Sequence, residues 1–227
     1  MMEAPAPRPR LRPARTPRRR PARPKRGPAA ETRARLIEAA AAVFNRAGYH
    51  GTDSNRLARA AGYAPATFYK HFPDKRTILL AAYEDWVTAE WHAIGTTLVD
   101  PASAAERAER IVAFVLEHHR RWKGLRASLR ALVATDAVVR RFHRAQRRRQ
   151  LELLARMRGG RARDEAATRD EASARVDDAI MLFTLERTLD AVAEGETADL
   201  GLDEDAVITR LRAVVRAAVD RPAATRG

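Results

Sequence analysis

The sequence predicts an all-α fold of about nine helices, with a small N-terminal helical unit followed by a larger C-terminal one. Two observations support this fold class. From Glu31 onward, apolar residues recur at three- and four-residue spacing, which gathers them on one face of each helix. Residues that favour helix starts and helix ends stand between these stretches. Both signals run through most of the chain and indicate helices throughout.

Composition limits the function classes that remain. The chain has 227 residues, which suffice for one large domain or two modest ones. It contains no cysteine, which excludes disulfides, zinc–thiolate sites and cysteine nucleophiles. Apolar runs such as residues 111–116 fall far short of the roughly 20 residues of a membrane span, so we expect a soluble protein. The net charge of +14 indicates a nucleic acid or another anionic surface as partner.

Residues 1–30 form a basic, proline-rich tail. The tail carries eight of the 12 prolines and +9 of the net charge of +14. Because proline removes backbone donors and like charges repel, we expect the tail to be disordered. No apolar stretch follows its basic start, so a secretory signal is not expected. Two interpretations remain open, a solvated leader or a polybasic arm that adds sequence-independent phosphate contacts.

The first two helices follow the tail. The first has Leu36 and Phe44 on its apolar face, with Thr32 as a plausible N-cap and Gly48 as its end. The second is expected over residues 53–61, capped by Thr52 or Asp53 and ended by Gly62.

The next two helices are punctuated by proline and aspartate. The third begins with Pro65, runs to about His71, and buries Phe68 and Phe72. The fourth starts behind Asp74 and continues toward residue 94. Two short helices joined by a glycine-centred turn form a helix-turn-helix, whose second helix enters the DNA major groove. Residues 31–76 have eight basic and four acidic side chains, which suits that use.

Three segments carry a family resemblance: Gly48-Tyr49-His50-Gly51-Thr52, Leu57-Ala58-Arg59-Ala60-Ala61-Gly62-Tyr63 and Ala66-Thr67-Phe68-Tyr69-Lys70-His71-Phe72-Pro73-Asp74-Lys75. Together they resemble the tetracycline-repressor (TetR) family of bacterial regulators over residues 32–80. The resemblance implies a transcriptional regulator in the bacterial cytoplasm, associated with the nucleoid. It implies double-stranded DNA with a palindromic operator, a second copy of the chain and a small-molecule effector as partners, and no cofactor.

The resemblance also implies roles for individual residues. Thr52, Tyr69 and Lys75 match the family's phosphate-binding positions. Thr67, Lys70 and His71 match positions that face the groove. Asn55, Pro65 and Ala66 lie at the margin of that group. Ala64 departs from the family pattern, which often has a capping serine there, so that phosphate contact is missing.

Five more helices are expected in the C-terminal part: residues 103–122, 125–135, 136–157, one opening at Ser173 or Asp177 and ending at 193, and 203–219. Residues 161–174 are charged and lack large apolar groups, so we expect a loop or lid there. The predicted organisation is thus a tail over residues 1–30, a helix-turn-helix domain over 31–77, an effector-binding and dimerisation domain over 78–220, and a disordered tail over 221–227.

The last two helices carry more apolar surface than a monomer would cover. In the family such helices pair with their copies as a four-helix bundle. The expected surface combines these residues: Ile180, Phe183, Leu185, Leu189, Val192, Val207, Ile208, Leu211, Val214, Val215 and Val219. A dimer also presents two recognition helices about one DNA turn apart.

The family's effector pocket lies among its middle helices, and candidate lining residues were chosen by chemistry and position: Trp86, Phe114, His118, Trp122, Phe142, Phe183, Thr184 and Glu186. Glu186 is either a cation-binding group or a charge paired with Arg187 or Arg175. No phosphate loop, nucleophile elbow or metal-binding histidine pair occurs, so neither catalytic nor metal-ligating residues are expected. The remaining alternative is a ligand-independent DNA-binding or co-regulator protein without an effector pocket.

Overall fold

The computed structural model describes residues 28–157 and 165–220, and this part of the chain consists of ten helices without strands. The expected N-terminal tail up to residue 27 and the expected C-terminal tail over 221–227 lie outside the described residues. The helices are α1 (Ala29–Ala47), α2 (Ser54–Ala60), α3 (Pro65–His71), α4 (Lys75–Leu98), α5 (Ala104–Arg121), α6 (Lys123–Thr135), α7 (Ala137–Met157), α8 (Glu165–Glu194), α9 (Glu196–Asp199) and α10 (Glu204–Val219).

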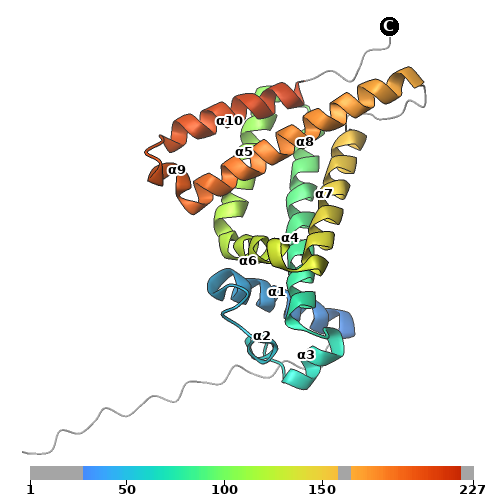
Figure 1. Ribbon diagram of the computed structural model, residues 1–227, viewed down its shortest axis with the longest axis vertical. Coiled ribbons are helices and arrows are strands. Elements are labelled where there is room, and N and C mark those ends of the chain that lie inside the picture. The colour runs from blue at the N-terminus through green and yellow to red at the C-terminus, as the bar shows by residue number, and fades with distance from the viewer. Residues whose placement is uncertain (1–27, 158–164, 221–227) are drawn as a thin grey trace, which may run out of the picture.

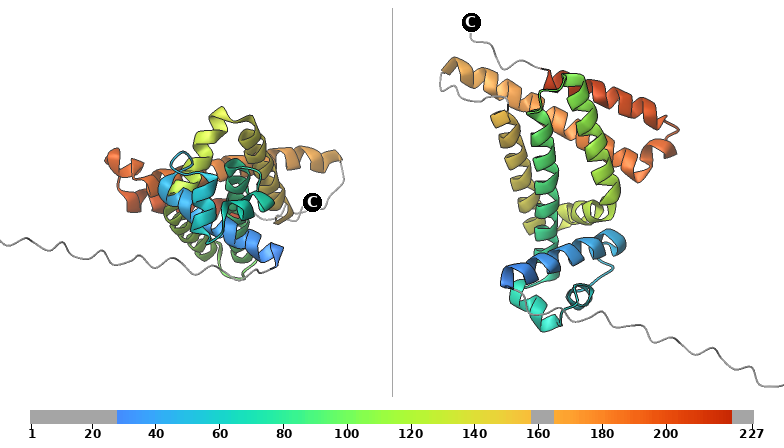
Figure 2. Two further views of the ribbon diagram at one scale, coloured as in Figure 1. Left: turned by 90° about the horizontal axis from the view of Figure 1, so that it is seen from below. Right: turned by 180° about the vertical axis from the view of Figure 1, so that it is seen from behind.

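The helices form a small unit at one end and a larger bundle at the other (Figures 1 and 2). The small unit comprises α1, α2 and α3. Helix α4 begins beside α3 and continues far into the bundle, where α5 packs against α4, α8 and α10. The predicted boundary between residues 77 and 78 therefore falls inside one continuous helix.

Side-chain caps start most of the predicted helices where the sequence indicated. Asp53 accepts from the Arg56 N–H to start α2, and Asp74 accepts from the Thr77 N–H to start α4. Ser103 and Glu106 form a reciprocal capping box at α5. Asp203 caps α10. These caps confirm the helix starts that local chemistry predicted.

Three expectations were wrong within the described residues. Helix α1 begins at Ala29 behind Pro28, so Thr32 is a buried residue inside the helix rather than its N-cap. Residues 165–174 belong to α8 and not to a loop, because a lack of large apolar groups does not oppose helix formation in a segment rich in Ala and Glu. Gly124 lies inside the first turn of α6 instead of separating two helices.

One apolar core runs through both parts of the molecule. It includes Phe44 and Leu57 from the small unit and Leu129 and Leu189 from the bundle, all essentially inaccessible to solvent. Among the described residues, no helix is both long and apolar enough to cross a membrane.

Candidate nucleic-acid interface and C-terminal cavity

Helices α2 and α3 meet in a fixed turn. The Tyr63 N–H donates to the Ala58 carbonyl at 2.9 Å, and the Gly62 N–H donates to the Arg59 carbonyl at 3.1 Å. These two bonds form a Schellman motif, which needs the left-handed backbone that Gly62 adopts with a φ of 81°. Pro65 then opens α3 with no side-chain cap, as the alanine at position 64 predicted. The turn fixes the direction in which α3 leaves α2.

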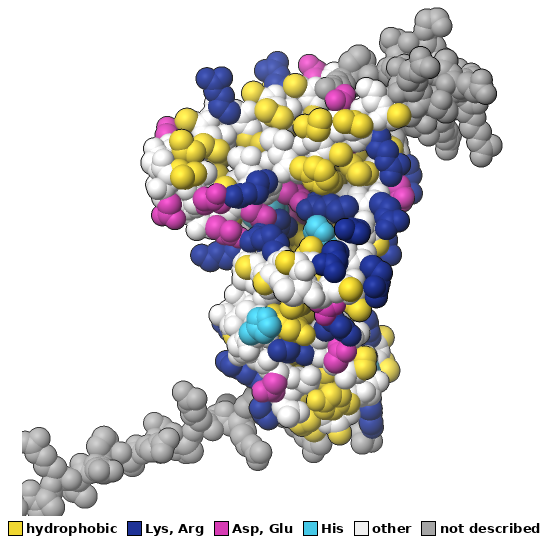
Figure 3. Space-filling model, in the orientation of Figure 1, with side chains coloured by type: hydrophobic (Ala, Val, Ile, Leu, Met, Phe, Trp, Pro, Cys, Tyr) yellow, Lys and Arg dark blue, Asp and Glu magenta, His cyan; other side chains and the backbone are white. Residues whose placement is uncertain are grey.

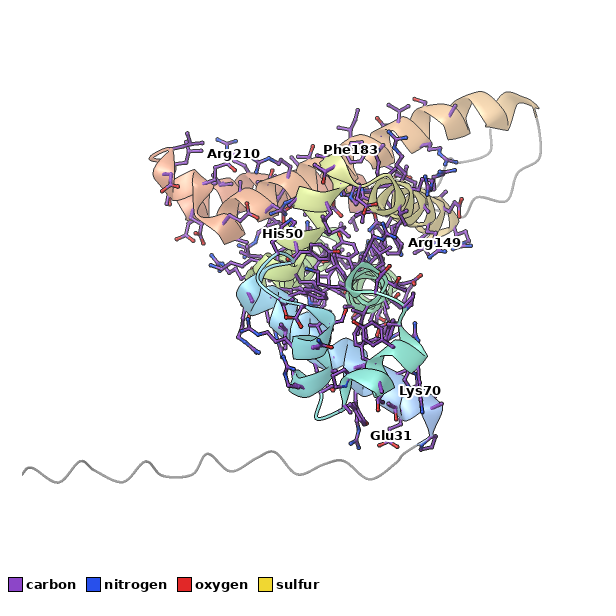
Figure 4. The ribbon with its side chains drawn as sticks, turned by 60° about the horizontal axis from the view of Figure 1, so that its bottom comes forward. Glu31, His50, Lys70, Arg149, Phe183 and Arg210 are labelled. Atoms are coloured by element: carbon purple, nitrogen blue, oxygen red, sulfur yellow. The ribbon has the colours of Figure 1, made fainter. Side chains whose placement is uncertain are left out.

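Two buried aromatic rings hold α3 against the small unit. Phe68 and Phe72 are almost completely buried, with ring centroids 5.9 Å apart, as the sequence predicted. The opposite side of α3 is open: the Tyr69 side chain is 54% exposed and Lys70 is also exposed. Figure 4 shows Lys70 at the end of the molecule remote from Phe183 and Arg210. Burial of one side thus presents the other to a partner.

Most residues expected to contact DNA are at least partly accessible to solvent. Asn55 and Ala66 are exposed, while Pro65, Thr67 and His71 are partly buried. Two basic side chains on α2, Arg56 and Arg59, are exposed as well. Seven of the nine expected residues, including Tyr69 and Lys70, thus lie on α2 and α3 with side chains that are exposed or partly buried.

The other two meet at the loop between α1 and α2: Thr52 belongs to this loop, and Lys75, the first residue of α4, reaches it with its side chain. Lys75 Nζ donates to the carbonyls of Tyr49 and Thr52, both at 2.9 Å, and lies 4.1 Å from the centroid of the Tyr49 ring. Thr52 is buried, with a relative exposure of 7%, and its hydroxyl makes no hydrogen bond within the described protein. Because an ammonium has three donors, Lys75 keeps one donor beyond those that fix the loop.

The same loop explains one glycine of the motif. A Cβ on Gly51 would lie 2.1 Å from the Ala47 carbonyl oxygen, which no side chain tolerates. Gly51 therefore lets the chain pass directly against the end of α1.

Asn45 joins the small unit to the bundle. Its Oδ1 accepts from the backbone N–H groups of Gly124 and Leu125 at 2.9 and 3.2 Å, and its Nδ2 donates to the Arg121 carbonyl at 2.8 Å. A Cβ on Gly124 would lie 2.0 Å from the Asn45 carbonyl oxygen, so α1 and α6 touch backbone to backbone. Sequence reasoning did not single out Asn45, because its partners lie more than seventy residues away.

A second joint lies beside α4. Arg76 donates to the Asp136 carboxylate at 3.0 Å, while Asp136 caps α7 through the Val138 N–H at 2.8 Å. Both charges are partly exposed, so this pair contributes little stability by itself. It does fix the start of α7 against the start of α4.

A cavity of about 220 Å³ lies inside the bundle, lined from α4, α5, α7, α8 and α10. Its walls are mostly apolar, and they also include the carboxylates of Glu90, Asp178 and Glu186 and the indole of Trp91. Of the eight residues expected to line an effector pocket, only Glu186 lines this cavity.

The other seven lie elsewhere. Trp86, His118 and Phe114 stack in one row, with centroids 4.7 Å apart for the first pair and 5.5 Å for the second. Phe142 meets Tyr83 edge to face at 6.3 Å, and Trp122 is partly buried at the end of α5. Phe183 and Thr184 are exposed on α8.

A network of buried charges lies next to the cavity. His119 is fully buried, with Nδ1 3.0 Å from Asp190 and Nε2 3.3 Å from Glu90. Arg126 makes a bidentate pair with Asp190 at 2.8 and 2.9 Å. Glu186 pairs with Arg147 and not with Arg187 or Arg175, the two partners considered from the sequence. Arg187 instead pairs with Glu196.

The network shifts the proton affinities of its members. Burial disfavours the charged imidazole, but hydrogen bonds with Asp190 and Glu90 raise the pKa of His119 above its usual value. Burial likewise works against the Asp190 carboxylate, while hydrogen bonds from His119 and Arg126 hold the pKa of Asp190 below its usual value. Burial raises the pKa of Tyr83 to about 12. His119 is therefore held between two carboxylates whose hydrogen bonds favour its protonated form.

The apolar surface expected for dimerisation divides between two sides of α8 and α10. Leu185, Leu189, Val192, Leu211 and Val215 are buried in the core of the protomer. The exposed members are Ile180 at 59%, Phe183 at 53% and Val214 at 46%, and Val176 extends the exposed row. Figure 3 shows hydrophobic side chains gathered where α8 and α10 lie in Figure 1.

A helix-turn-helix unit carried by a larger helical bundle with an internal cavity defines a class, the helical transcriptional regulators. Residues 36–82 match the family model described as bacterial regulatory proteins of the tetR family. The N-terminal helical unit is therefore similar to the DNA-binding domain of the TetR family, and the chain as a whole has the fold of TetR-family transcriptional regulators.

Solved structures agree in fold over most of the chain. A putative TetR-family regulator from Rhodococcus sp. is 16% identical with a TM-score of 0.60, covering 84% of this chain and 100% of its own. A putative regulator from Saccharomonospora viridis, in complex with choline, is 21% identical with a TM-score of 0.56, covering 82% and 96%. AibR, in complex with isovaleryl coenzyme A and operator DNA, is 18% identical with a TM-score of 0.54, covering 80% and 96%. Comparison with curated proteins gave no match.

Proposed function

We propose that the protein is a homodimeric, sequence-specific DNA-binding regulator that represses transcription until a small-molecule effector releases it. The observation that carries this proposal is the open side of α3, where Tyr69 and Lys70 project because Phe68 and Phe72 are buried behind them. Its site of action is the bacterial chromosome in the cytoplasm. The known regulators that share its fold support this function over catalysis.

The proposed contacts divide by type. Thr67, Lys70 and His71 read base edges in the major groove, with Asn55, Pro65 and Ala66 at the margin. Tyr69 binds a backbone phosphate through its hydroxyl. Lys75 adds a phosphate contact with the donor that the loop leaves to it, and Thr52 contributes from the start of α2. We further propose that the basic tail adds sequence-independent phosphate contacts.

A symmetric dimer is the second part of the proposal. Val176, Ile180, Phe183 and Val214 form an exposed apolar row on α8 and α10. Burying such a row against its own copy removes apolar surface from water and sets two α3 helices on one face of the DNA. This use assigns residues 31–77 to DNA binding and residues 78–220 to dimerisation and effector binding.

Effector release is the third part. The cavity of about 220 Å³ favours a ligand-responsive regulator over the ligand-independent alternative. The complexes of AibR with isovaleryl coenzyme A and operator DNA, and of the S. viridis regulator with choline, support the same assignment. An effector that binds better to the DNA-free state lowers operator affinity by that difference in affinity.

Selection of bound duplexes from a random library by the full-length protein tests the function. We expect enrichment of an inverted repeat, bound by a particle of twice the protomer mass in light scattering. Lys70→Ala should weaken binding to the selected duplex, whereas Lys123→Ala removes an equal charge from the exposed start of α6 and should leave binding unchanged. A monomer in solution, or enrichment of no sequence, would refute the proposal.

A further inference from the structure

Three features of the cavity define which ligand it accepts. Its charged lining residues are Glu90, Asp178 and Glu186, and among residues whose side chains are described no Lys, Arg or His lines it. The remaining walls are mainly aliphatic, from α4, α5, α8 and α10. The cavity therefore combines apolar walls with acidic side chains and no basic side chain among the described lining residues.

The three carboxylates are deeply placed. Glu90, Asp178 and Glu186 have relative exposures of 2%, 8% and 7%. Glu90 lies 3.3 Å from the imidazole Nε2 of His119, and Glu186 pairs with Arg147, so each of these two acids has one basic partner that does not line the cavity. Because an ionised carboxylate offers about four lone-pair sites, one base leaves acceptor capacity for a ligand. Glu90 and Glu186 can therefore accept from a guest without giving up the partners they already have.

Trp91 supplies an independent indication. Its residue is 6% exposed, it lines the cavity, and its indole N–H makes no hydrogen bond within the described protein. Buried indole N–H groups usually find an acceptor, so the unpaired Trp91 N–H indicates a ligand at this wall of the cavity with an acceptor atom on its body. Trp91 follows Glu90 directly, so both belong to the same turn of α4 at the cavity.

The nearby bases do not serve an anionic ligand. Arg126 is engaged by Asp190, Arg147 by Glu186, and His119 by Asp190 and Glu90. A carboxylate or phosphate in the cavity would face three buried acids without a lining base, which is unfavourable in a poorly solvated site. A metal ion is not favoured either, since no group of three or more His, Asp or Glu among the described side chains is placed to hold one.

We propose that the cavity binds a monovalent organic cation, a primary or quaternary ammonium on a compact aliphatic or aromatic body. The ammonium lies toward Glu90, Asp178 and Glu186, and the apolar body lies against the aliphatic walls and the Trp91 ring. This assignment rests on the proposed effector function and specifies the chemical class of the effector.

Calorimetry of the full-length protein without DNA tests the class with three probes of one shape: phenethylammonium, phenethyl alcohol and phenylacetate. We expect phenethylammonium to bind at least about tenfold more tightly than the alcohol, the gain of one charge-assisted hydrogen bond, and phenylacetate to bind most weakly. Equal or tighter binding of phenylacetate overturns the proposal. So does a failure of all three probes to bind at millimolar concentration.

Two variants locate the charge. Asp178→Asn and Glu186→Gln keep the side-chain shapes and should each lower the affinity for phenethylammonium about tenfold, with the affinity for phenethyl alcohol changed by less than about twofold. Glu84→Gln removes an exposed carboxylate of α4 that pairs with Arg149 outside the cavity, and should change neither affinity. Equal losses for both probes would mean that the carboxylates only maintain the fold, and would overturn the proposal.

Operator binding is measured separately by fluorescence anisotropy. Charge-selective ligand binding without any operator binding would refute the proposed function and leave the ligand class standing. Operator binding with no preference for phenethylammonium would leave the DNA-binding function standing and refute the proposed ligand class. If a variant unfolds, the three probes on the wild-type protein still decide the ligand class.

Discussion

Gly124→Ala tests whether the joint between α1 and α6 is as close as the structure describes. In a helix, replacing glycine by alanine normally stabilises by about 1 kcal/mol. Here a Cβ would lie 2.0 Å from the Asn45 carbonyl oxygen, and the obstacle is backbone rather than a movable side chain. Overpacking costs about 1–3 kcal/mol, and we expect about 2–3 kcal/mol here because backbone atoms cannot move aside as a flexible side chain can. We therefore expect the sign to reverse, with a net loss of about 1–2 kcal/mol.

Thermal unfolding followed by circular dichroism measures this loss. For a chain of this size each kcal/mol shifts Tm by about 2–4 °C, so Gly124→Ala should lower Tm by about 2–8 °C. Lys123→Ala introduces alanine one residue earlier, at an exposed site of the same turn, and should leave Tm nearly unchanged. Adding Asn45→Ala should not rescue Gly124→Ala, because the clash is with the backbone of Asn45. A Tm for Gly124→Ala at or above that of the wild type would refute the close approach.

Four further predictions concern binding and pH. Thr67→Ala should relax preference at particular base pairs in a competition assay, and a uniform loss would contradict base reading. Lys75→Ala should lower stability by about 1–3 kcal/mol through the lost bonds to Tyr49 and Thr52, and should flatten the salt dependence of operator binding by about one unit; an unchanged slope would restrict Lys75 to the loop. Deleting residues 1–26 should cost affinity at low salt only, and no cost at low salt would make the tail a bystander. The raised pKa of His119 stabilises the fold fully below its ordinary 6.5 and less as pH rises through the raised pKa, so Tm should fall with rising pH in the wild type and less in His119→Gln; parallel curves would exclude His119 as the cause.

Local chemistry was sufficient to predict the helix-turn-helix end of the molecule. Asp53, Gly62 and Pro65 act within one turn of their own helices, so their types at their spacing predict where α2 and α3 begin and end. Phe68 and Phe72 are one turn apart and lie on one side, which predicts their common burial. The family motif adds the assignment of the opposite side to DNA.

The cavity could not be predicted in the same way. Spacing shows which residues share one side of a helix, but it does not show which neighbour that side meets. Trp86 and Trp91 both lie on α4, yet Trp86 stacks on His118 and Arg126 lies over it, while Trp91 lines the cavity. For the same reason, the sequence placed Leu189 and Ile180 of α8 on one expected dimer surface, whereas Leu189 is buried in the protomer and Ile180 is exposed.

Helices α4 and α6 connect the N-terminal helical unit to the bundle, because each makes contacts in both. Helix α4 begins at Lys75, which holds the loop before α2, and carries Glu90 into the cavity about 22 Å further along at 1.5 Å per residue. Helix α6 begins at the Asn45 joint and carries Arg126 into the network that His119 and Asp190 share with Glu90. If the proposed cation changes the hydrogen bonding of Glu90, we expect both connections to respond, since neither helix contains a break between its two contacts. Under the proposed release, the α1–α6 joint and the α4–loop contact must shift together. Loosening either one alone should reduce the effect of ligand on operator affinity without abolishing ligand binding.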